Sequence, residues 1–315
     1  MLLFMKKITG LLSFILLAGL GHSQNKKTTV DADKISIDNG NITSSYRGKT
    51  LLWEITGNGL KIPSYLFGTM HILCATDARL SGNLKTIIKD SRKIYFEIDM
   101  DNMAELMGAM KFLRMKDGVK LSDLLTPVEY ERVKDYFDKN QTLLPFTMMT
   151  RFKPYFISSL IGEKMMTCEK KNGMEELIMR ESKQYDKEIK GLETTEFQAS
   201  IFDSIPYNKQ AKDLLAYIDS IDTYRQITMA MVDVYREQDL ERMDSLMKKS
   251  DPGMESYMDL LLYNRNRNWV KMLPAIMEQG PVLFAVGAGH LPGDEGVIKL
   301  LQKKGYKLKP LDNSN

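Results

Sequence analysis

The order strand, Gly-x-x-His motif, helix, strand occurs near both ends of the 315-residue chain, and no other feature of the sequence restricts the fold as strongly. In the first half-unit, the strand-like segment 65–67 leads into Gly68-Thr69-Met70-His71. A helical pattern at 78–90 follows, and then Lys93-Ile-Tyr-Phe-Glu-Ile-Asp99, whose residues favour a strand. An earlier strand at 51–56 is expected to form a hairpin with 65–67, because a Gly-Asn-Gly turn lies between them.

The second half-unit repeats this order at the far end of the chain. The segment 281–286 leads into Gly287-Ala288-Gly289-His290, and a helical pattern at 294–304 and a strand at 306–311 follow. Between the half-units, from about 102 to 278, the spacing of apolar residues is mostly helical. We therefore predict an α+β fold, in which strands from both half-units share one mixed sheet and a large helical insertion packs over it.

The insertion contains one clear interruption, a short strand at 187–193 that leads into a helix from Thr194. The predicted helices of the insertion before its last segment cover 128–137, 152–166, 174–185 and 207–247. A final helix is predicted at 255–272.

The amino-terminal segment has the features of a secretory signal. Lys6-Lys7 precede an apolar run from Ile8 to Leu20, and small residues follow near a cleavage point at about Ser23. We expect residues 1–23 to be a signal peptide, 24–49 a polar flexible leader, and 50–315 a single domain. The protein would then be exported, to the periplasm or the exterior.

No later segment has the roughly 18 consecutive apolar residues of a membrane span. The formal net charge is +3, and the lysines are spread among acidic residues, which gives no indication of nucleic-acid binding. The two cysteines, Cys74 and Cys168, are too few for a disulfide scaffold. Export would permit them to pair if the fold brings them close, and the sequence leaves this open.

The histidines are the main indication of function. The chain has three, and signal cleavage would remove His22, which leaves His71 and His290, each in a Gly-x-x-His motif. In open sheets the loop after the carboxyl end of a strand is where ligands bind. A lone histidine is more often structural, but the same context in two half-units favours one shared site. We expect each motif glycine to let the backbone turn sharply as it leaves its strand.

Two imidazoles do not complete a catalytic metal site, which usually has about three protein ligands. Glu97 is the first candidate for the third ligand, because it lies near the carboxyl end of the strand at 93–99 and a buried carboxylate needs a partner. Glu193 is the second candidate. Its alternative role is a carboxylate at a helix amino terminus.

Arg265 interrupts an apolar stripe on the predicted helix at 255–272. The stripe consists of Met258, Leu262, Trp269 and Met272. An inward arginine needs a carboxylate, so we predict that Arg265 pairs with Glu97 or Glu193, where it could also stabilise an anionic transition state. The alternative is an arginine whose charged end reaches the solvent at the rim. Asn266 beside it is polar, and its role is ambiguous from the sequence.

Several segments together resemble the TraB/GumN family, which is related to the TIKI metalloproteases. They are Trp53, Leu66-Phe67-Gly68-Thr69-Met70-His71, Phe96-Glu97-Ile98-Asp99, Gly191-Leu192-Glu193-Thr194 with Gln198, Arg265-Asn266 with Trp269, and Val286-Gly287-Ala288-Gly289-His290-Leu291-Pro292-Gly293. The resemblance implies an α+β fold related to the erythromycin esterase and ChaN-like group. It also implies that His71, Glu97 and His290 form the site, together with Arg265 and Glu193.

The sequence departs from the family pattern at one place. After Gly173-Met174 the resemblance would lead us to expect an Asp and a His, but this chain has Glu175 and no histidine there. A third imidazole is therefore not expected, and carboxylates gain importance as ligands.

Two functions follow from these residues. The first is a divalent-metal-dependent hydrolase, with a peptidase favoured, in which His71, His290 and Glu97 hold manganese, cobalt or zinc and a bound water attacks a peptide or other small substrate. Glu97, Glu193 and Arg265 are its candidate catalytic residues. The second is a non-catalytic protein that uses the same two histidines to bind haem, an iron chelate or a peptide.

Overall fold

A computed structural model of the chain describes residues 49–140, 144–250 and 255–314. The predicted signal peptide and all of the predicted leader except Lys49 lie outside these ranges. In the described part, no helix is long and apolar enough to cross a membrane.

A six-stranded sheet forms the centre of the fold. Its strands are β1 (Leu52–Gly57), β2 (Ser64–Thr69), β4 (Lys93–Ile98), β6 (Glu188–Glu193), β7 (Val282–Gly287) and β8 (Tyr306–Pro310). Their order across the sheet is β6-β4-β7-β2-β1-β8. Strands β6, β4, β7 and β2 are parallel, whereas β1 is antiparallel to both of its neighbours. The prediction of an α+β fold with a mixed sheet is thus confirmed.

The position of β7 joins the two half-units. It lies between β2 and β4, so the strand of the second half-unit is inserted between the two strands of the first. Thr69 at the end of β2 pairs with Gly287 at the end of β7, and Ile98 pairs with Glu193. Because carboxyl ends of parallel strands meet at one edge of a sheet, both Gly-x-x-His motifs and both candidate glutamates come to the same edge.

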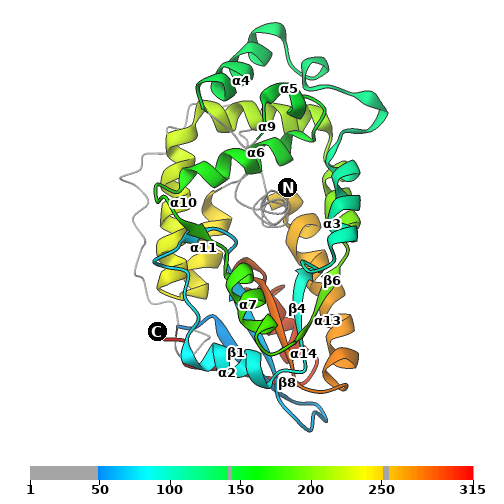
Figure 1. Ribbon diagram of the computed structural model, residues 1–315, viewed down its shortest axis with the longest axis vertical. Helices are drawn as coiled ribbons and strands as arrows, with labels where there is room; N and C mark the ends of the chain where they lie inside the picture. The colour runs from blue at the N-terminus through cyan, green and yellow to red at the C-terminus, as the bar shows by residue number, and fades with distance from the viewer. Residues whose placement is uncertain (1–48, 141–143, 251–254, 315) are drawn as a thin grey trace.

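Four helices pack around this sheet, in the lower half of Figure 1. They are α2 (Gly82–Asp90), α7 (Met174–Lys183), α13 (Asn264–Met277) and α14 (Val297–Lys303). Helices α2 and α7 contact each other, as do α13 and α14. Their buried residues join those of the strands in one apolar core, with Trp53, Phe67, Phe96, Trp269 and Phe284 among its largest members.

Most of the other helices contribute to a second apolar core, and they gather in the upper half of Figure 1. The helices of the insertion, apart from α7 and α13, are α3 (Met103–Ala109), α4 (Pro127–Lys139), α5 (Phe146–Met149), α6 (Pro154–Gly162), α8 (Thr195–Ile201), α9 (Tyr207–Asp219), α10 (Ile221–Arg236), α11 (Leu240–Ser250) and α12 (Glu255–Met258). Short 3-10 segments extend or connect several of them. Helix α6 is buried along its whole length, which places it at the centre of this second core. Helix α11 and the second half of α10 instead pack into the core of the sheet, and Leu106 of α3 packs on Ile98.

The pattern at 207–247 is three helices rather than one. The first break is at Ser220, and the second is at Gln238, whose φ of 55° is left-handed and ends α10. Apolar spacing continues across both breaks, so periodicity alone does not reveal them. The helix predicted at 255–272 is α12, a π-helical turn at Asp259–Tyr263 and α13, which continues to Met277.

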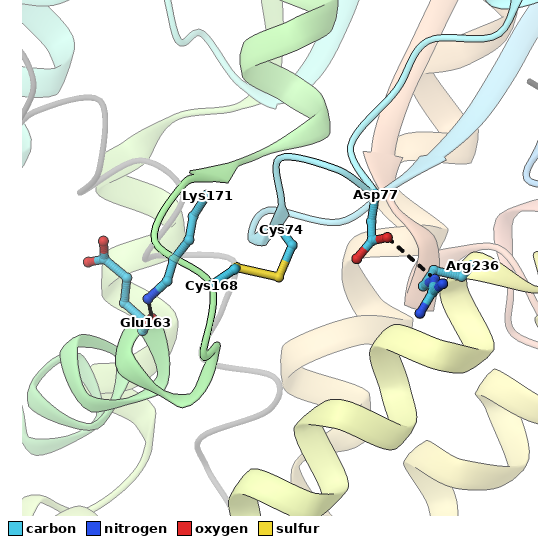
Figure 2. Close-up of a disulfide and its surroundings, with 6 residues drawn as sticks. All are labelled: Cys74, Asp77, Glu163, Cys168, Lys171 and Arg236. Carbon is cyan, nitrogen blue, oxygen red and sulfur yellow. Dashed lines mark hydrogen bonds and ion pairs between the residues drawn. A yellow bond between two sulfur atoms is a disulfide. The ribbon is translucent and has the colours of Figure 1, made fainter.

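A two-stranded sheet lies beside the large one and was not predicted. It pairs β3 (Leu73–Cys74), just after the first Gly-x-x-His motif, with β5 (Lys171–Asn172). Cys74 and Cys168 form a disulfide next to it, with a Cα–Cα distance of 5.8 Å (Figure 2). The question that the sequence left open is therefore answered in favour of pairing.

Candidate functional site

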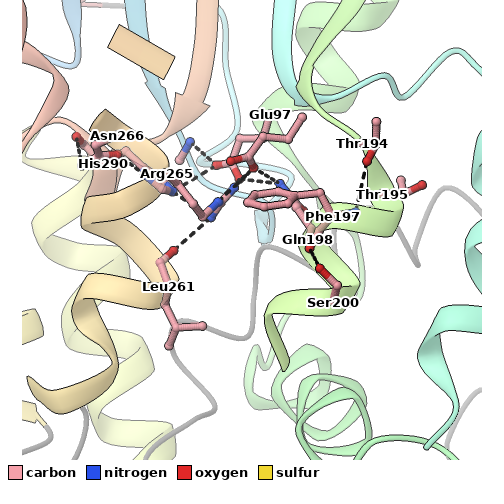
Figure 3. A network of polar contacts seen from close by, with 12 residues as sticks. Glu97, Thr194, Thr195, Phe197, Gln198, Ser200, Leu261, Arg265, Asn266 and His290 are labelled. Carbon is pink, nitrogen blue, oxygen red and sulfur yellow. Dashed lines mark hydrogen bonds and ion pairs between the residues drawn. The ribbon is translucent and has the colours of Figure 1, made fainter. Parts of the chain in front are cut away.

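All five predicted site residues meet at the carboxyl edge of the large sheet. Glu97 and Glu193 lie at the ends of β4 and β6, and His71 follows β2. His290 ends the 3-10 turn Ala288–His290 that follows β7. Arg265 extends from α13 toward Glu97, while Gln198 approaches the same carboxylate from α8 (Figure 3).

Arg265 binds both glutamates. Its Nη2 lies 2.6 Å from Oε2 of Glu97, and its Nε donates to Oε2 of Glu193 at 2.9 Å. The side chain is only 7% exposed, and its guanidinium lies over the ring of Trp269, 4.9 Å from the ring centroid. Burial would lower the pKa of Arg265, but the carboxylates of Glu97 and Glu193 raise it. The predicted pairing is confirmed, with both partners rather than one, and the alternative of a rim arginine is excluded.

Glu97 is ionised at the centre of this cluster. Its Oε1 accepts a hydrogen bond from the backbone N–H of Gly287 at 2.8 Å, and its Oε2 accepts one from Gln198 at 3.3 Å. Burial would raise the pKa of Glu97, but Arg265 and then the histidines hold it well below its usual range. The carboxylate is therefore a permanent anion, and Oε1 also lies 3.6 Å from Nε2 of His290.

His290 is held as a neutral ring. Its Nδ1 lies 2.6 Å from Oδ1 of Asn266, whose amide nitrogen donates to the backbone oxygen of Glu295, so the ring donates from Nδ1. Burial lowers the pKa of His290 to about 3, and Arg265 acts in the same direction, against the opposing charge of Glu97. Nε2 therefore carries a lone pair directed toward Glu97 and Arg265, at 3.3 Å from Nη1 of the arginine.

His71 has a different environment. Its Nδ1 lies 2.7 Å from Oε1 of Glu175, a buried residue in the first turn of α7. Burial would lower the pKa of His71, but the Glu175 carboxylate raises it above its usual value. A carboxylate at Nδ1 keeps a proton on that atom, which leaves Nε2 as the atom that faces the cluster.

Comparison with known proteins assigns the chain to a family. The sequence profile of the TraB/PrgY/gumN family matches residues 51–310. The chain belongs to the TraB/PrgY/gumN family. Among curated proteins it is 21% identical to Metalloprotease TIKI1 of Danio rerio, over 82% of this chain and 63% of that protein. It is 20% identical to Metalloprotease TIKI1 of Homo sapiens and 22% identical to a Metalloprotease TIKI homolog of Amphimedon queenslandica, each over 82% of this chain and 61% of the relative.

The chain thus spans about three fifths of the length of these relatives. No solved structure gives a significant match to the chain. The names of these relatives describe them as metalloproteases. The residues of this chain can therefore be compared with the ligands that a metal ion requires.

The donor set fits a divalent ion. A Cβ atom built on Gly287 would lie 3.0 Å from Oε1 of Glu97, 3.6 Å from Cδ2 of His290 and 3.9 Å from Nε2 of His71. The three side chains thus surround a space that only glycine leaves open. Two imidazoles and a carboxylate are a common ligand set of catalytic zinc, and anchored Nδ1 atoms are typical of ligating histidines. Within the described ranges, no three His, Cys, Asp or Glu side chains are already gathered closely enough to hold an ion.

Two expectations about this region were wrong. Gly68 and Gly287 lie inside β2 and β7, and neither has a positive φ, so the motif glycines do not serve a sharp turn. They are needed for space: a Cβ on Gly68 would lie 3.1 Å from Cα of Ala288. Met272 is 39% exposed and does not belong to the buried stripe of its helix. The buried stripe instead continues through Trp269, Leu273 and Met277.

Two supporting residues of the site were not recognised in the sequence as such. Asn266 is fully buried and fixes the ring of His290. Its spacing from Leu262 and Trp269, four and three residues, places it on the apolar stripe, which was a usable signal. Glu175 was noticed only as a departure from the family pattern. No local signal connects it to His71, because α7 reaches the motif only through tertiary packing.

Proposed function

We propose that this protein is a divalent-metal-dependent hydrolase that cleaves peptides, with His71, His290 and Glu97 as the metal ligands. The observation that carries the proposal is the space at Gly287, which Nε2 of His71, the ring of His290 and Oε1 of Glu97 all approach. A divalent ion bound there supplies a Lewis acid that polarises a substrate carbonyl and lowers the pKa of a water molecule. Manganese, cobalt and zinc all suit mixed nitrogen and oxygen ligands.

The other residues of the cluster stabilise charge at the site or hold the charged groups in position. Arg265 places a permanent positive charge beside Glu97 and His290, where negative charge on a carbonyl oxygen would be stabilised. Glu193 binds Nε and Nη2 of the guanidinium, and Gln198 donates to both glutamates. We therefore assign Arg265 to charge stabilisation, and Glu193 to the positioning of Arg265 rather than to the ion.

Access to the site differs among its three proposed ligands. The side chain of His71 is 13% exposed, whereas those of His290 and Glu97 are 1% and 5% exposed. The side chain of His71 is therefore the most open to solvent of the three. A peptide is expected to approach from the side of His71, with Arg265 and His290 forming the inner wall.

Export to the periplasm or the exterior stays part of the proposal. It rests on the signal-like residues 1–23, which lie outside the described part of the chain. The Cys74–Cys168 disulfide supports it, because disulfides persist mainly in oxidising compartments.

The first test measures metal content before any substrate is known. Protein purified without chelators is expected to hold close to one equivalent of a divalent metal by elemental analysis, and His290→Ala is expected to reduce this at least tenfold because it removes a ligand. His71→Ala should behave similarly. Hydrolysis of a fluorogenic peptide library should be lost in both variants and in the chelated wild type. Metal-free wild-type protein with undiminished hydrolysis would refute the proposal.

The same two histidines could instead serve a non-catalytic binder of haem, an iron chelate or a peptide. A Soret band that appears on haem addition and is lost in His290→Ala, without any peptide hydrolysis, would favour that alternative. Metal retention with hydrolysis, and no Soret shift, would favour the hydrolase.

Gly287→Ala is expected to weaken metal binding at least tenfold while the fold persists. The φ of Gly287 is −50°, which alanine adopts readily, but its methyl group would enter the space between Glu97 and His71. Affinity is measured by isothermal titration with manganese or cobalt. Gly82→Ala is the matched control, because a Cβ there meets nothing within 4 Å. Equal affinity in the two variants would place the ion elsewhere.

A further inference from the structure

The segment that carries His71 is attached to the helical insertion by its backbone. Met174 N–H donates to the oxygen of Met70 at 3.0 Å, and Leu73 pairs with Asn172 in the two-stranded sheet. A Cβ on Gly173 would lie 2.5 Å from the backbone oxygen of His71, so the two segments are in direct contact. The position of His71 therefore depends on the insertion as well as on β2.

A covalent bond closes this attachment. Cys74, three residues after His71, is bonded to Cys168, four residues before Asn172, and the two cysteines are 94 positions apart (Figure 2). Close to the disulfide, Ala75 N–H donates to the oxygen of Lys170 at 2.9 Å. Both cysteines are only partly buried.

Helix α7 starts immediately after this attachment and brings Glu175 to His71. Glu175 is 4% exposed, and its Oε1 is 2.7 Å from Nδ1 of the ring. The next residue on the helix, Glu176, is also in the first turn but is 43% exposed and pairs with Arg180. The helix dipole explains an acidic residue at either position, whereas burial against an imidazole distinguishes Glu175.

We propose that Glu175 is a positioning residue for His71, and that the Cys74–Cys168 disulfide holds it in place, so that the site is complete only in the oxidised protein. Glu175 fixes the ring through Nδ1 and thereby directs Nε2 toward Gly287. The disulfide keeps α7 and the His71 segment in register. This inference deepens the proposed function and rests on it for the role of Nε2.

The redox step is an ordinary thiol–disulfide exchange. A dithiol reductant donates two electrons and two protons, the S–S bond between Cys74 and Cys168 breaks, both become thiols, and the reductant becomes a cyclic disulfide. Without the S–S bond, the register of the two segments depends on the two-residue strands β3 and β5, a few backbone contacts and the apolar packing of Leu73 and Met174 in the sheet core. Such short pairing frays easily, so the ring of His71 loses its fixed partner.

The test uses nuclear magnetic resonance on the metal-free protein, so that it does not depend on the metal proposal. The proton on Nδ1 of His71, held against a carboxylate, should give a resolved downfield signal that exchanges slowly with water. Few histidines make the assignment simple, and His71→Ala confirms it. The signal is expected in the oxidised wild type and in oxidised Glu176→Ala. It should be absent from Glu175→Ala and from the wild type after its disulfide has been reduced.

A second measurement extends the test to the ion. Manganese or cobalt affinity should fall 10- to 100-fold in Glu175→Ala, as expected for a group that orients a ligating histidine, and Glu175→Asp should recover part of it. Glu176→Ala should bind like the wild type. The double variant Cys74→Ala/Cys168→Ala should have a metal affinity similar to that of Glu175→Ala. The comparison is made at a temperature at which circular dichroism shows that both variants are folded.

The outcomes separate this inference from the function that it rests on. A downfield signal that persists in Glu175→Ala, or in the reduced protein, would overturn the inference even if metal binds. Loss of the signal in both, in a protein that binds no metal in any form, would support the positioning of His71 while it refutes the proposed hydrolase.

Discussion

Replacing Arg265 with methionine is expected to lower the free energy of unfolding by about 3–5 kcal/mol, because it leaves two carboxylates buried without their counter-ion. Arg265 contacts Glu97 and Glu193, and the side chains of all three are at most 7% exposed. Methionine fills a similar volume, so the loss reports the uncompensated charge rather than a cavity. Peptide hydrolysis should be lost as well if the arginine stabilises the transition state.

Urea unfolding followed by circular dichroism measures the first effect. Arg267→Met is the matched control on the same helix, because Arg267 is 36% exposed and pairs at the surface with Asp259 and Glu295, where an ion pair contributes at most about 1 kcal/mol. Adding Glu193→Gln to Arg265→Met should restore part of the stability, because it removes one of the two uncompensated charges. Equal stability of Arg265→Met and Arg267→Met would show that the cluster is not buried as described.

Loss of the Cys74–Cys168 disulfide is the second large effect. The bond closes a loop over a sequence separation of 94, and the loop-closure entropy of such a crosslink corresponds to about 4.7 kcal/mol. Cys74→Ala/Cys168→Ala should therefore unfold at a clearly lower urea concentration than the wild type. The physical reason is that the unfolded chain has more conformations without the crosslink than with it.

The control for this effect is the reductant itself. Adding a dithiol should lower the stability of the wild type to that of the double variant and leave the double variant unchanged. A wild-type protein whose stability does not respond to full reduction would contradict the entropic account. This measurement concerns stability alone, whereas the resonance of His71 reports the arrangement of the site.

The sequence was sufficient to predict the elements that form the sheet edge. The strands at 51–56, 65–67, 93–99, 187–193, 281–286 and 306–311 correspond to β1, β2, β4, β6, β7 and β8. Strand patterns and turn residues are local, and each could be recognised without knowledge of its neighbours. The inward position of Arg265 was predictable for a similar reason, since a charged residue on an apolar stripe must find a partner.

Helix boundaries within the insertion were less predictable. The breaks at Ser220 and Gln238 do not interrupt the apolar spacing, because residues on both sides of each break are buried in the same core. Tyr217 and Tyr224 lie in the helical core, and Tyr235 and Leu240 lie in the sheet core. The disulfide was undetermined for another reason. Nothing local to Cys74 or Cys168 shows that β3 and β5 pair, and this pairing alone brings the two sulfur atoms together.

The sequence by itself determined which residue types are available for the site: two histidines in matching motifs, two glutamates at strand ends and one arginine on an apolar stripe. Only the tertiary structure decided how they are used. Insertion of β7 between β2 and β4 brings the motifs together, Asn266 fixes the ring of His290, and Glu175 approaches the ring of His71. These contacts join segments far apart in the chain, so they depend on packing of the whole fold, and no local pattern shows which residues become partners.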